Sequence, residues 1–408
     1  MNFTLKGFEV LLIGCFDTKA DEFYYLYQCL KEEGIPVFTI NIGIFGSTDL
    51  FPVDIEAIEV ARKGGVSLEE LQEASDRGWA IDIMGKGSAE IIKELYKSNE
   101  IGGIIGMGGG GGTYMILKGM KHLPIGFPKV CISTLATKDL SSHIGSKDII
   151  LFPSIVDIAG VNFINRKIMQ QAAKTVGALS TIKYKEVNKK RGHFAISVFG
   201  NTTKCADECI SFLAEMDYET VSFHAVGTGG RSMEELINQG IFDGVIDLTI
   251  TELADEMYGG ICSAGPDRLK AAGARGIPQV VVPGCLDMVN FGSIETVPKM
   301  YKDRLLFQWA PDVTLMRTNE EENRKLGKHI AMRLNQSSGS VIVLFPMGGL
   351  SEIGGFGKAF YAPEIDRVLF DSIRKYLRKE IEIREVDTNI NTKEFARETI
   401  EAFLQVVE

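Results

Sequence analysis

Five consecutive glycines, Gly108 to Gly112, separate a short apolar run from a helix-like segment, and Thr113 follows them. Glycine lets backbone N–H groups approach an anion closely, and the start of a helix adds about half a positive charge. A phosphate is the usual ligand of such a junction. We therefore expect a phosphate to bind at Gly109, Gly110, Gly111, Gly112 and Thr113. The spacing matches neither a Walker A motif nor a clean dinucleotide fingerprint, and the alternative is a flexible turn without a ligand.

Polar residues also follow other apolar runs of the first half. Asp17, Thr18 and Lys19 come directly after the first run, and Thr134 follows the fourth. Their hydroxyl and ammonium groups suit phosphate, and the Asp17 carboxylate suits Mg2+, which prefers oxygen ligands. The alternative for Asp17 and Thr18 is structural, namely capping of the next helix. The turn after the fifth run, at 152–157, borders the same expected cleft.

The second half carries side chains that suit catalysis. His224 lies in a strand-like run before a second glycine cluster, Gly227 to Gly230, and histidine is the usual acid–base residue near neutral pH. Glu252, Asn290 and Arg317 lie at or near the ends of other runs, and arginine binds carboxylate or phosphate in a bidentate manner. We expect these four residues to form a catalytic site for a small anionic metabolite. The alternatives are a histidine packed in the core and a solvated acid at position 252.

Composition limits the class of protein. The chain has 408 residues, which is enough for about two domains. Hydrophobic residues make up 45% and charged residues 24%, as is usual in globular proteins. A net charge of -10 argues against nucleic-acid binding, and no apolar run is long enough to span a membrane. The start of the chain lacks a signal-peptide pattern, and the seven cysteines form no Cys-x-x-Cys pair, so we expect a cytoplasmic protein. Cys205 and Cys209 leave a metal half-site as a minor alternative.

Apolar strand-like runs alternate with helical patterns along the chain, for example Val10 to Phe16 and then Asp21 to Glu33. Such alternation is typical of parallel sheets that helices cover on both faces. The pattern pauses at 183–191, which holds five basic residues, and then restarts. We expect an α/β protein with two Rossmann-like doubly wound parallel-sheet domains, at 1–182 and 192–408. Ligands of such sheets bind beyond the carboxyl ends of the strands, where the candidate residues fall.

In their order along the chain, these motifs resemble one family, that of the ATP-binding N-terminal domain of the tomato mosaic virus resistance protein and its bacterial and fungal relatives. The resemblance runs nearly the whole length, and its carriers are Asp17 to Lys19, Gly108 to Thr113, Ser133-Thr134, Phe152 to Ser154, Asp157, His224-Ala225, Gly227 to Arg231, Thr251-Glu252, Asp255, Asp287 to Gly292 and Met316 to Thr318. The resemblance implies that the first half binds ATP with Mg2+ and that the chain forms a homodimer.

Two functions are compatible with these motifs. The first is an enzyme, a phosphotransferase or ligase, that uses ATP on a small anionic metabolite at the interdomain cleft. The second is a nucleotide-binding sensor or interaction protein without chemistry. A sugar-kinase-like loop of the Gly-Gly-Asp-Gly-Thr type fits less well, because this chain has glycine where that aspartate would stand. A sensor has no need for the four second-half residues to meet, so their convergence separates the two functions.

Overall fold

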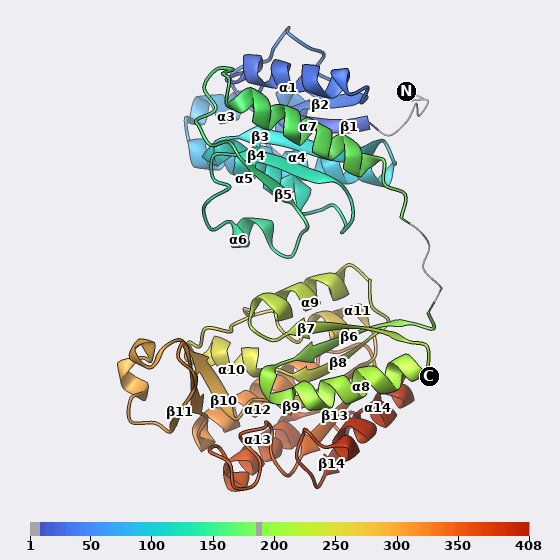
Figure 1. The fold of residues 1–408 in the computed structure, drawn as a ribbon, viewed down its shortest axis with the longest axis vertical. Coiled ribbons are helices and arrows are strands. Elements are labelled where there is room, and N and C mark those ends of the chain that lie inside the picture. The colour runs from blue at the N-terminus through green and yellow to red at the C-terminus, as the bar shows by residue number, and fades with distance from the viewer. Residues whose placement is uncertain (1–8, 185–189, 408) are drawn as a thin grey trace. The chain divides into compact units, whose positions relative to one another are not determined.

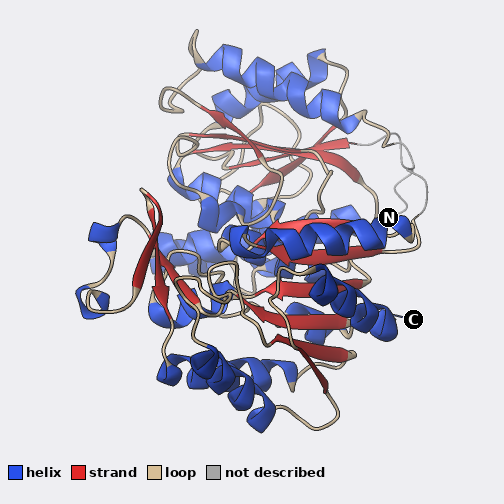
Figure 2. Cartoon of the chain, turned by 60° about the horizontal axis from the view of Figure 1, so that its bottom comes forward, coloured by secondary structure: helices blue, strands red, loops and turns tan. Residues whose placement is uncertain are grey.

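The computed structural model describes residues 9–184 and 190–407. The chain divides into two compact units, 1–185 and 186–408. The expected linker at 183–191 includes this division, and its residues 185–189 lie outside the described part of the chain. Each unit is an α/β structure with helices on both faces of a parallel sheet (Figure 2), which confirms the expected fold class.

The first unit contains a five-stranded parallel sheet with the strand order β2-β1-β3-β4-β5 (Figure 1). Its strands are β1 (Glu9–Gly14), β2 (Val37–Asn41), β3 (Ile101–Gly108), β4 (Lys129–Ser133) and β5 (Ile150–Pro153). Its helices are α1 (Ala20–Glu32), α2 (Ala57–Lys63), α3 (Leu68–Ala74), α4 (Arg77–Lys97), α5 (Gly110–Met120), α6 (Ser141–Ile144) and α7 (Asn165–Ser180). Helices α1 and α7 cover one face of the sheet, and α2, α4 and α5 cover the other.

The strand β1 shows why this sheet reads as continuous apolar runs. Successive residues of a strand point to opposite faces, and both faces of this sheet are covered. Val10 and Leu12 pack in the core beneath α1 and α7, whereas Leu11 and Ile13 pack beneath α4 and α5. Because Val10 to Gly14 are all buried, the sequence has no polar alternation there.

The second unit contains a six-stranded parallel sheet with the order β14-β13-β9-β8-β6-β7. Its strands are β6 (His193–Val198), β7 (Glu219–His224), β8 (Gly244–Thr249), β9 (Gln279–Gly284), β13 (Val341–Pro346) and β14 (Glu382–Val386). Its helices are α8 (Thr203–Glu215), α9 (Thr228–Asn238), α10 (Thr251–Tyr258), α11 (Ala271–Arg275), α12 (Glu320–Leu334), α13 (Pro363–Tyr376) and α14 (Lys393–Val407). When the strands are numbered within each unit, both sheets have the order 2-1-3-4-5, and the second adds a sixth strand.

A small antiparallel sheet, which the sequence analysis did not expect, interrupts the second unit between β9 and α12. Its strands are β10 (Met288–Phe291), β11 (Leu306–Ala310) and β12 (Val313–Arg317), in the order β10-β12-β11. Asn290 and Arg317 therefore lie within this sheet and not in loops at the ends of parallel strands. Across the described part of the chain, no helix is long and apolar enough to cross a membrane.

Candidate functional site

The strand order of the first unit creates a switch point between β1 and β3. The chain runs outward from β1 to β2 at one edge, and then continues from β3 toward the other edge. Open α/β sheets with the order 2-1-3-4-5 bind ligands beyond the carboxyl ends of the strands at such a point. Two of the expected phosphate-binding segments meet there, namely the turn at 15–19 after β1 and the glycine turn at 108–112 after β3.

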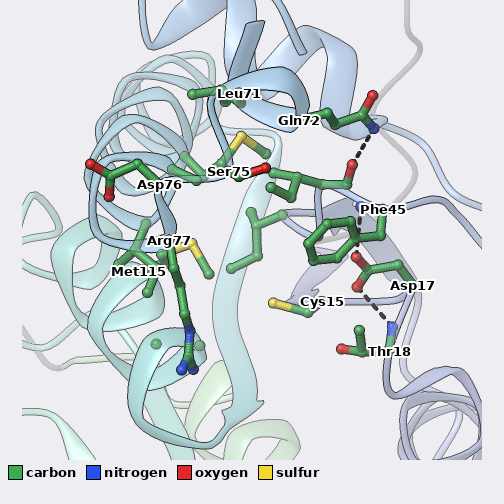
Figure 3. A pocket seen from close by; sticks show the side chains of 18 residues that line it. Cys15, Asp17, Thr18, Phe45, Leu71, Gln72, Ser75, Asp76, Arg77 and Met115 are labelled. Atoms are coloured by element: carbon green, nitrogen blue, oxygen red, sulfur yellow. Dashed lines mark hydrogen bonds between the residues drawn. The ribbon is translucent and has the colours of Figure 1, made fainter. Parts of the chain in front are cut away.

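A hollow of about 370 Å³, called here the first hollow, opens at this switch point (Figure 3). One wall comes from the turns after β1 and β2, and the other comes from the starts of α4 and α5. Most of its wall is apolar, with Ile42, Ile44, Phe45, Ile81, Met84 and Met115. Polar groups lie at one side, among them Asp17, Thr18 and Arg77, and Gly111 and Gly112 form part of the wall. An apolar chamber with a few convergent polar groups is typical of small-molecule sites.

The glycine turn leaves backbone donors free at the start of α5. The helix has Gly109 as its N-cap, and no side chain caps it. The first N–H with a helical acceptor is that of Thr113, which donates to Gly109 O at 2.8 Å. The N–H groups of Gly110, Gly111 and Gly112 precede it and have no acceptor within the helix. The start of α5 therefore offers donors to an anion.

Close approach explains the glycine at position 108, and an unusual backbone conformation explains none of the five. None of the five has a positive φ, so a side chain would not strain the backbone. A Cβ on Gly108 would lie 2.8 Å from Thr113 N, which is too close for any other residue. A Cβ on Gly110 would meet no atom within 4 Å. Substitution at Gly110 is therefore a test of ligand binding that leaves the packing intact.

The Asp17 carboxylate connects the turns after β1 and β2. Its Oδ1 accepts from Thr18 N at 2.7 Å, and its Oδ2 accepts from Phe45 N at 2.9 Å (Figure 3). The capping alternative does not hold, because Lys19 is the N-cap of α1 and no side chain bonds there. The Lys19 ammonium donates to Ile158 O in the turn after β5. Asp17 and Thr18 line the first hollow, whereas Lys19 does not.

The Thr113 hydroxyl has hydrogen-bond partners inside the protein, whereas the Thr134 hydroxyl lies beside the glycine turn. The Thr113 hydroxyl is buried, donates to Gly108 O at 3.0 Å and shares a hydrogen bond of 2.7 Å with Ser133 Oγ. Its N–H is also engaged, since it donates to Gly109 O within α5. Thr134 Oγ1 lies 3.9 Å from the position that a Cβ on Gly109 would take, beside the glycine turn.

Arg77, the first residue of α4, also lines the first hollow and was not predicted from the sequence. Its side chain extends along the wall of the first hollow (Figure 3), and one guanidinium nitrogen lies 3.8 Å from a Cβ built on Gly111. Arg77 is exposed, and it has no ion pair or hydrogen bond with another described residue. A guanidinium is well suited to phosphate oxygens. Nothing in the local sequence marks this arginine, because only the packing of α4 beside α5 brings it to the glycine turn.

The second glycine cluster holds a carboxylate of the protein itself. Glu252 is fully buried, and its Oε1 accepts from Gly227 N at 2.7 Å and from Gly230 N at 3.0 Å. Gly227 has a φ of +87°, and a Cβ on Gly230 would collide with the Glu252 carboxylate, so both positions require glycine. The expectation that Glu252 is a base or orients His224 is therefore wrong, as is the alternative of a solvated acid.

Arg268, which the sequence analysis also missed, neutralises this buried carboxylate. Its Nε donates to Glu252 Oε2 at 2.6 Å, and its terminal nitrogens pair with Asp247 and with Glu234, the latter at 3.1 Å. Burial lowers the pKa of Arg268, but these carboxylates more than offset this effect, and the pKa lies well above its usual value. Burial raises the pKa of Glu234. This network is an internal ion cluster with no side open to a ligand among the described residues.

Asn290 lies in a separate buried cluster. Its amide nitrogen Nδ2 donates to Thr251 Oγ1 and to Asp255 Oδ1, each at 3.1 Å, and its backbone N–H donates to the same carboxylate at 2.9 Å. The second oxygen of Asp255 accepts from Cys262 N at 2.7 Å. Burial raises the pKa of Asp255 to about 7. Asn290 therefore holds β10 against α10, and it does not face a substrate.

Arg317 and His224 also lie outside any shared anion site. The Arg317 guanidinium is buried, donates to Asp366 Oδ1 at 2.6 Å and to Phe360 O at 2.9 Å, and so has internal partners. His224 is exposed at the end of the edge strand β7, with its ring 5.7 Å from that of Phe199, and it is not a core residue. The four residues expected to form the catalytic site thus lie in four different environments. The expected small-anion site in the second unit is not formed by them.

The structure offers no ready-made cluster for a metal. Within residues 9–184 and 190–407, no group of three or more His, Cys, Asp or Glu side chains is arranged to hold one. Cys205 and Cys209 are buried in the core of the second unit, and Cys209 Sγ contacts Ala396 O. Asp17, the residue expected to bind Mg2+, belongs to no such group among the described residues.

Comparison with known proteins identifies the family. Residues 8–185 match the N-terminal domain, and residues 191–407 the C-terminal domain, of the "Uncharacterised protein family (UPF0261)". The chain belongs to the UPF0261 family. A UPF0261 protein of Clostridium tetani is 42% identical over 389 residues, which are 95% of this chain and 96% of that protein. A UPF0261 protein of Rhizobium meliloti is 36% identical over 98% of this chain and 99% of its own.

The UPF0261 chain is also similar to the ToMV resistance protein Tm-1(GCR237) of Solanum lycopersicum. The two are 33% identical over 98% of this chain and 56% of the tomato protein. The resemblance that the motifs indicated is therefore confirmed. Among solved structures, the glycosyltransferase SnogD of Streptomyces nogalater matches over 98% of this UPF0261 chain and 96% of its own, at 12% identity and a TM-score of 0.19.

Proposed function

We propose that this protein binds ATP with Mg2+ in its first unit, at the switch point between β1 and β3. One observation carries the proposal: a glycine turn with free backbone donors opens onto the first hollow, where Arg77 has no partner of its own among the described residues. The comparable turn of the second unit is filled by Glu252. An anion from solution is therefore proposed for the first turn and not for the second.

Each part of the nucleotide has a counterpart in this site. The N–H groups of Gly110 to Gly112 and the Arg77 guanidinium suit the phosphates. The apolar wall, with the exposed ring of Phe45 at its rim, suits a nucleobase, because bases stack on aromatic rings. The Asp17 carboxylate suits Mg2+, which keeps several waters and binds through one or two carboxylates and the phosphates. A cytoplasmic location, where ATP and Mg2+ are abundant, accords with this proposal.

The best-supported function is nucleotide binding, and catalysis requires a second substrate site. The four residues expected to bind a small anionic metabolite lie in separate environments. A nucleotide-dependent sensor or interaction protein therefore follows from the first unit alone. An enzyme would also need a binding site for a second substrate next to the phosphates of the nucleotide.

The glycine turn gives a direct test of the proposal. Gly110→Glu places a carboxylate at the turn, whereas Gly110→Gln has nearly the same shape without the charge, and a Cβ at this position would meet no atom within 4 Å. We expect isothermal titration calorimetry with ATP and MgCl2 to show binding to the native chain and to the Gln variant, with a loss of at least about tenfold in the Glu variant. The native chain failing to bind ATP, or all three chains binding it equally, would contradict the proposal.

A further inference from the structure

A second hollow lies in the first unit, beyond the carboxyl ends of β4 and β5. It has a volume of about 360 Å³ and is lined by the two turns that follow these strands, 133–137 and 153–157. Thr134 lines this hollow and lies beside the glycine turn, since a Cβ on Gly109 would be 3.9 Å from Thr134 Oγ1. Gly111 and Gly112, at the other end of the turn, line the first hollow. The glycine turn therefore lines the first hollow and lies beside Thr134 of the second.

Serine and threonine residues line part of the second hollow beside apolar residues, and Asp157 is its single ionisable residue. Thr134 Oγ1, Thr137 Oγ1 and Asp157 Oδ2 form no hydrogen bond with another residue in the described ranges. Asp157 is exposed, and its other oxygen accepts from Ile158 N at 2.8 Å, which orients the carboxylate. No lysine, arginine or histidine lines the hollow. The Lys19 ammonium lies next to Asp157, at Ile158 O, but outside the lining. The lining itself offers a carboxylate and hydroxyl groups, which suit a neutral molecule with hydroxyl groups.

The turn that carries Asp157 is held in one conformation. Ser154 N donates to Ser133 O at 3.1 Å, and Ser154 Oγ donates to Val156 O at 2.7 Å. A three-residue turn follows, in which Val156 N donates to Ser154 O at 2.7 Å and Ile155 has a φ of +63°. A β-branched residue rarely adopts this conformation, so its neighbours must impose it. The lining of the hollow is therefore arranged before a ligand arrives.

We propose that the second hollow is the acceptor site of a phosphotransferase and that it takes a neutral polyhydroxylated molecule, a sugar or a polyol. This proposal rests on the proposed ATP site in the first hollow. A hydroxyl oxygen of the acceptor forms a bond to the γ-phosphorus of ATP. The bond from that phosphorus to the β,γ-bridging oxygen breaks, and its electron pair leaves with ADP. The hydroxyl proton passes to the Asp157 carboxylate, and Thr134 and Thr137 bind the other hydroxyl groups.

The test measures transfer of radiolabelled γ-phosphate by the full chain with Mg2+, with glucose, ribose, glycerol and myo-inositol as separate acceptors. Asp157→Asn keeps the shape and removes the base. Asp139→Asn is the matched control, because Asp139 is also exposed and also binds a nearby backbone N–H, that of Ser141, at 2.9 Å. We expect transfer to at least one acceptor, a loss of about 100-fold or more in Asp157→Asn and an unchanged rate in Asp139→Asn. The affinity for ATP should stay the same in all three chains.

Thr134→Val provides a second variant should Asp157→Asn fail to fold, and we expect it to raise the KM for the acceptor and to change kcat little. Two results would overturn the acceptor site and leave the ATP site standing: ATP binding without transfer to any of the four acceptors, and equal transfer by the Asp157 and Asp139 variants. A native chain that does not bind ATP would overturn both proposals.

Discussion

The Glu252 side chain has two structural roles. Its carboxylate caps the start of α9 through Gly227 N and Gly230 N, and it also receives Nε of the buried Arg268. Loss of the Glu252 carboxylate would leave Gly227 N, Gly230 N and Arg268 Nε without this acceptor, while the Arg268 terminal nitrogens keep Asp247 and Glu234. An unpaired buried donor or charge costs far more than the pair contributes.

We expect Glu252→Ala to lower the free energy of unfolding of the second unit by about 3 to 5 kcal/mol, because three buried donors lose their acceptor. Urea unfolding of the full chain, followed by circular dichroism, measures the change. Glu256→Ala is the control, since Glu256 lies one turn further along α10, is exposed and bonds only to Ser263 Oγ among the described residues. Equal stability of the two variants would refute this structural role.

Asp255 makes the stability of the second unit depend on pH. Burial raises its pKa to about 7, whereas an unfolded chain has an aspartate pKa of about 3.9. Between these values the folded chain holds a proton that the unfolded chain has released, so stability falls as the pH rises through this window. The slope that one group contributes is at most about 1.4 kcal/mol per pH unit.

The measurement is the free energy of unfolding from pH 5 to pH 7.5 for the native chain and for Asp255→Asn. We expect the native chain to lose stability more steeply as the pH rises, because the variant cannot ionise at this position. Carboxyl carbon NMR of the native chain gives the midpoint directly. A midpoint for Asp255 near 4, or parallel stability curves, would rule out the effect.

At the scale of elements, the packing of α4 beside α5 determines which charge reaches the glycine turn. Arg77 begins α4, and its guanidinium lies 3.8 Å from a Cβ built on Gly111 in the first turn of α5. We expect Arg77→Ala to weaken ATP binding by about tenfold or more and Arg77→Lys to restore part of the affinity, since a lysine keeps the charge but loses bidentate geometry. Calorimetry with ATP and Mg2+ measures both.

Arg62→Ala is the matched control for this position. Arg62 belongs to α2, is exposed and pairs only with Glu59 at 3.7 Å among the described residues, a surface pair of little energetic value. It does not line the first hollow. Should Arg62→Ala weaken ATP binding as much as Arg77→Ala does, the effect would be one of overall charge and not of this site.

The features that the sequence predicted are those with local causes. The parallel strands were recognisable because burial on both faces gives continuous apolar runs, as in β1. The glycine turn was recognisable because strand, turn and helix are contiguous. Arg77 and Arg268 were missed because only tertiary packing brings them to their partners. For the same reason, the expected convergence of His224 with Arg317 was wrong. A position near a strand end does not reveal which buried carboxylate or carbonyl will accept hydrogen bonds from the side chain.

At the scale of the whole molecule, the two units share a strand order but use their glycine turns differently. The first turn lines a hollow, and the second holds an internal carboxylate. The resemblance to the family also implies a homodimer, which stays a prediction. Light scattering at micromolar concentration should give a mass near twice the 44.8 kDa of one chain. A mass equal to one chain would contradict it, and the native chain with and without ATP is the comparison to make.

The carboxylate in the second glycine turn has a thermodynamic consequence. Glu252 is part of the chain, so its effective concentration at the turn does not depend on the solution. A nucleotide on the first turn would obey mass action, and at 100 times its dissociation constant it would stabilise the folded first unit by about 2.7 kcal/mol. The melting temperature of the first unit would then rise with the concentration of ATP. The melting temperature of the second unit would not depend on ATP, because the carboxylate in its glycine turn belongs to the chain.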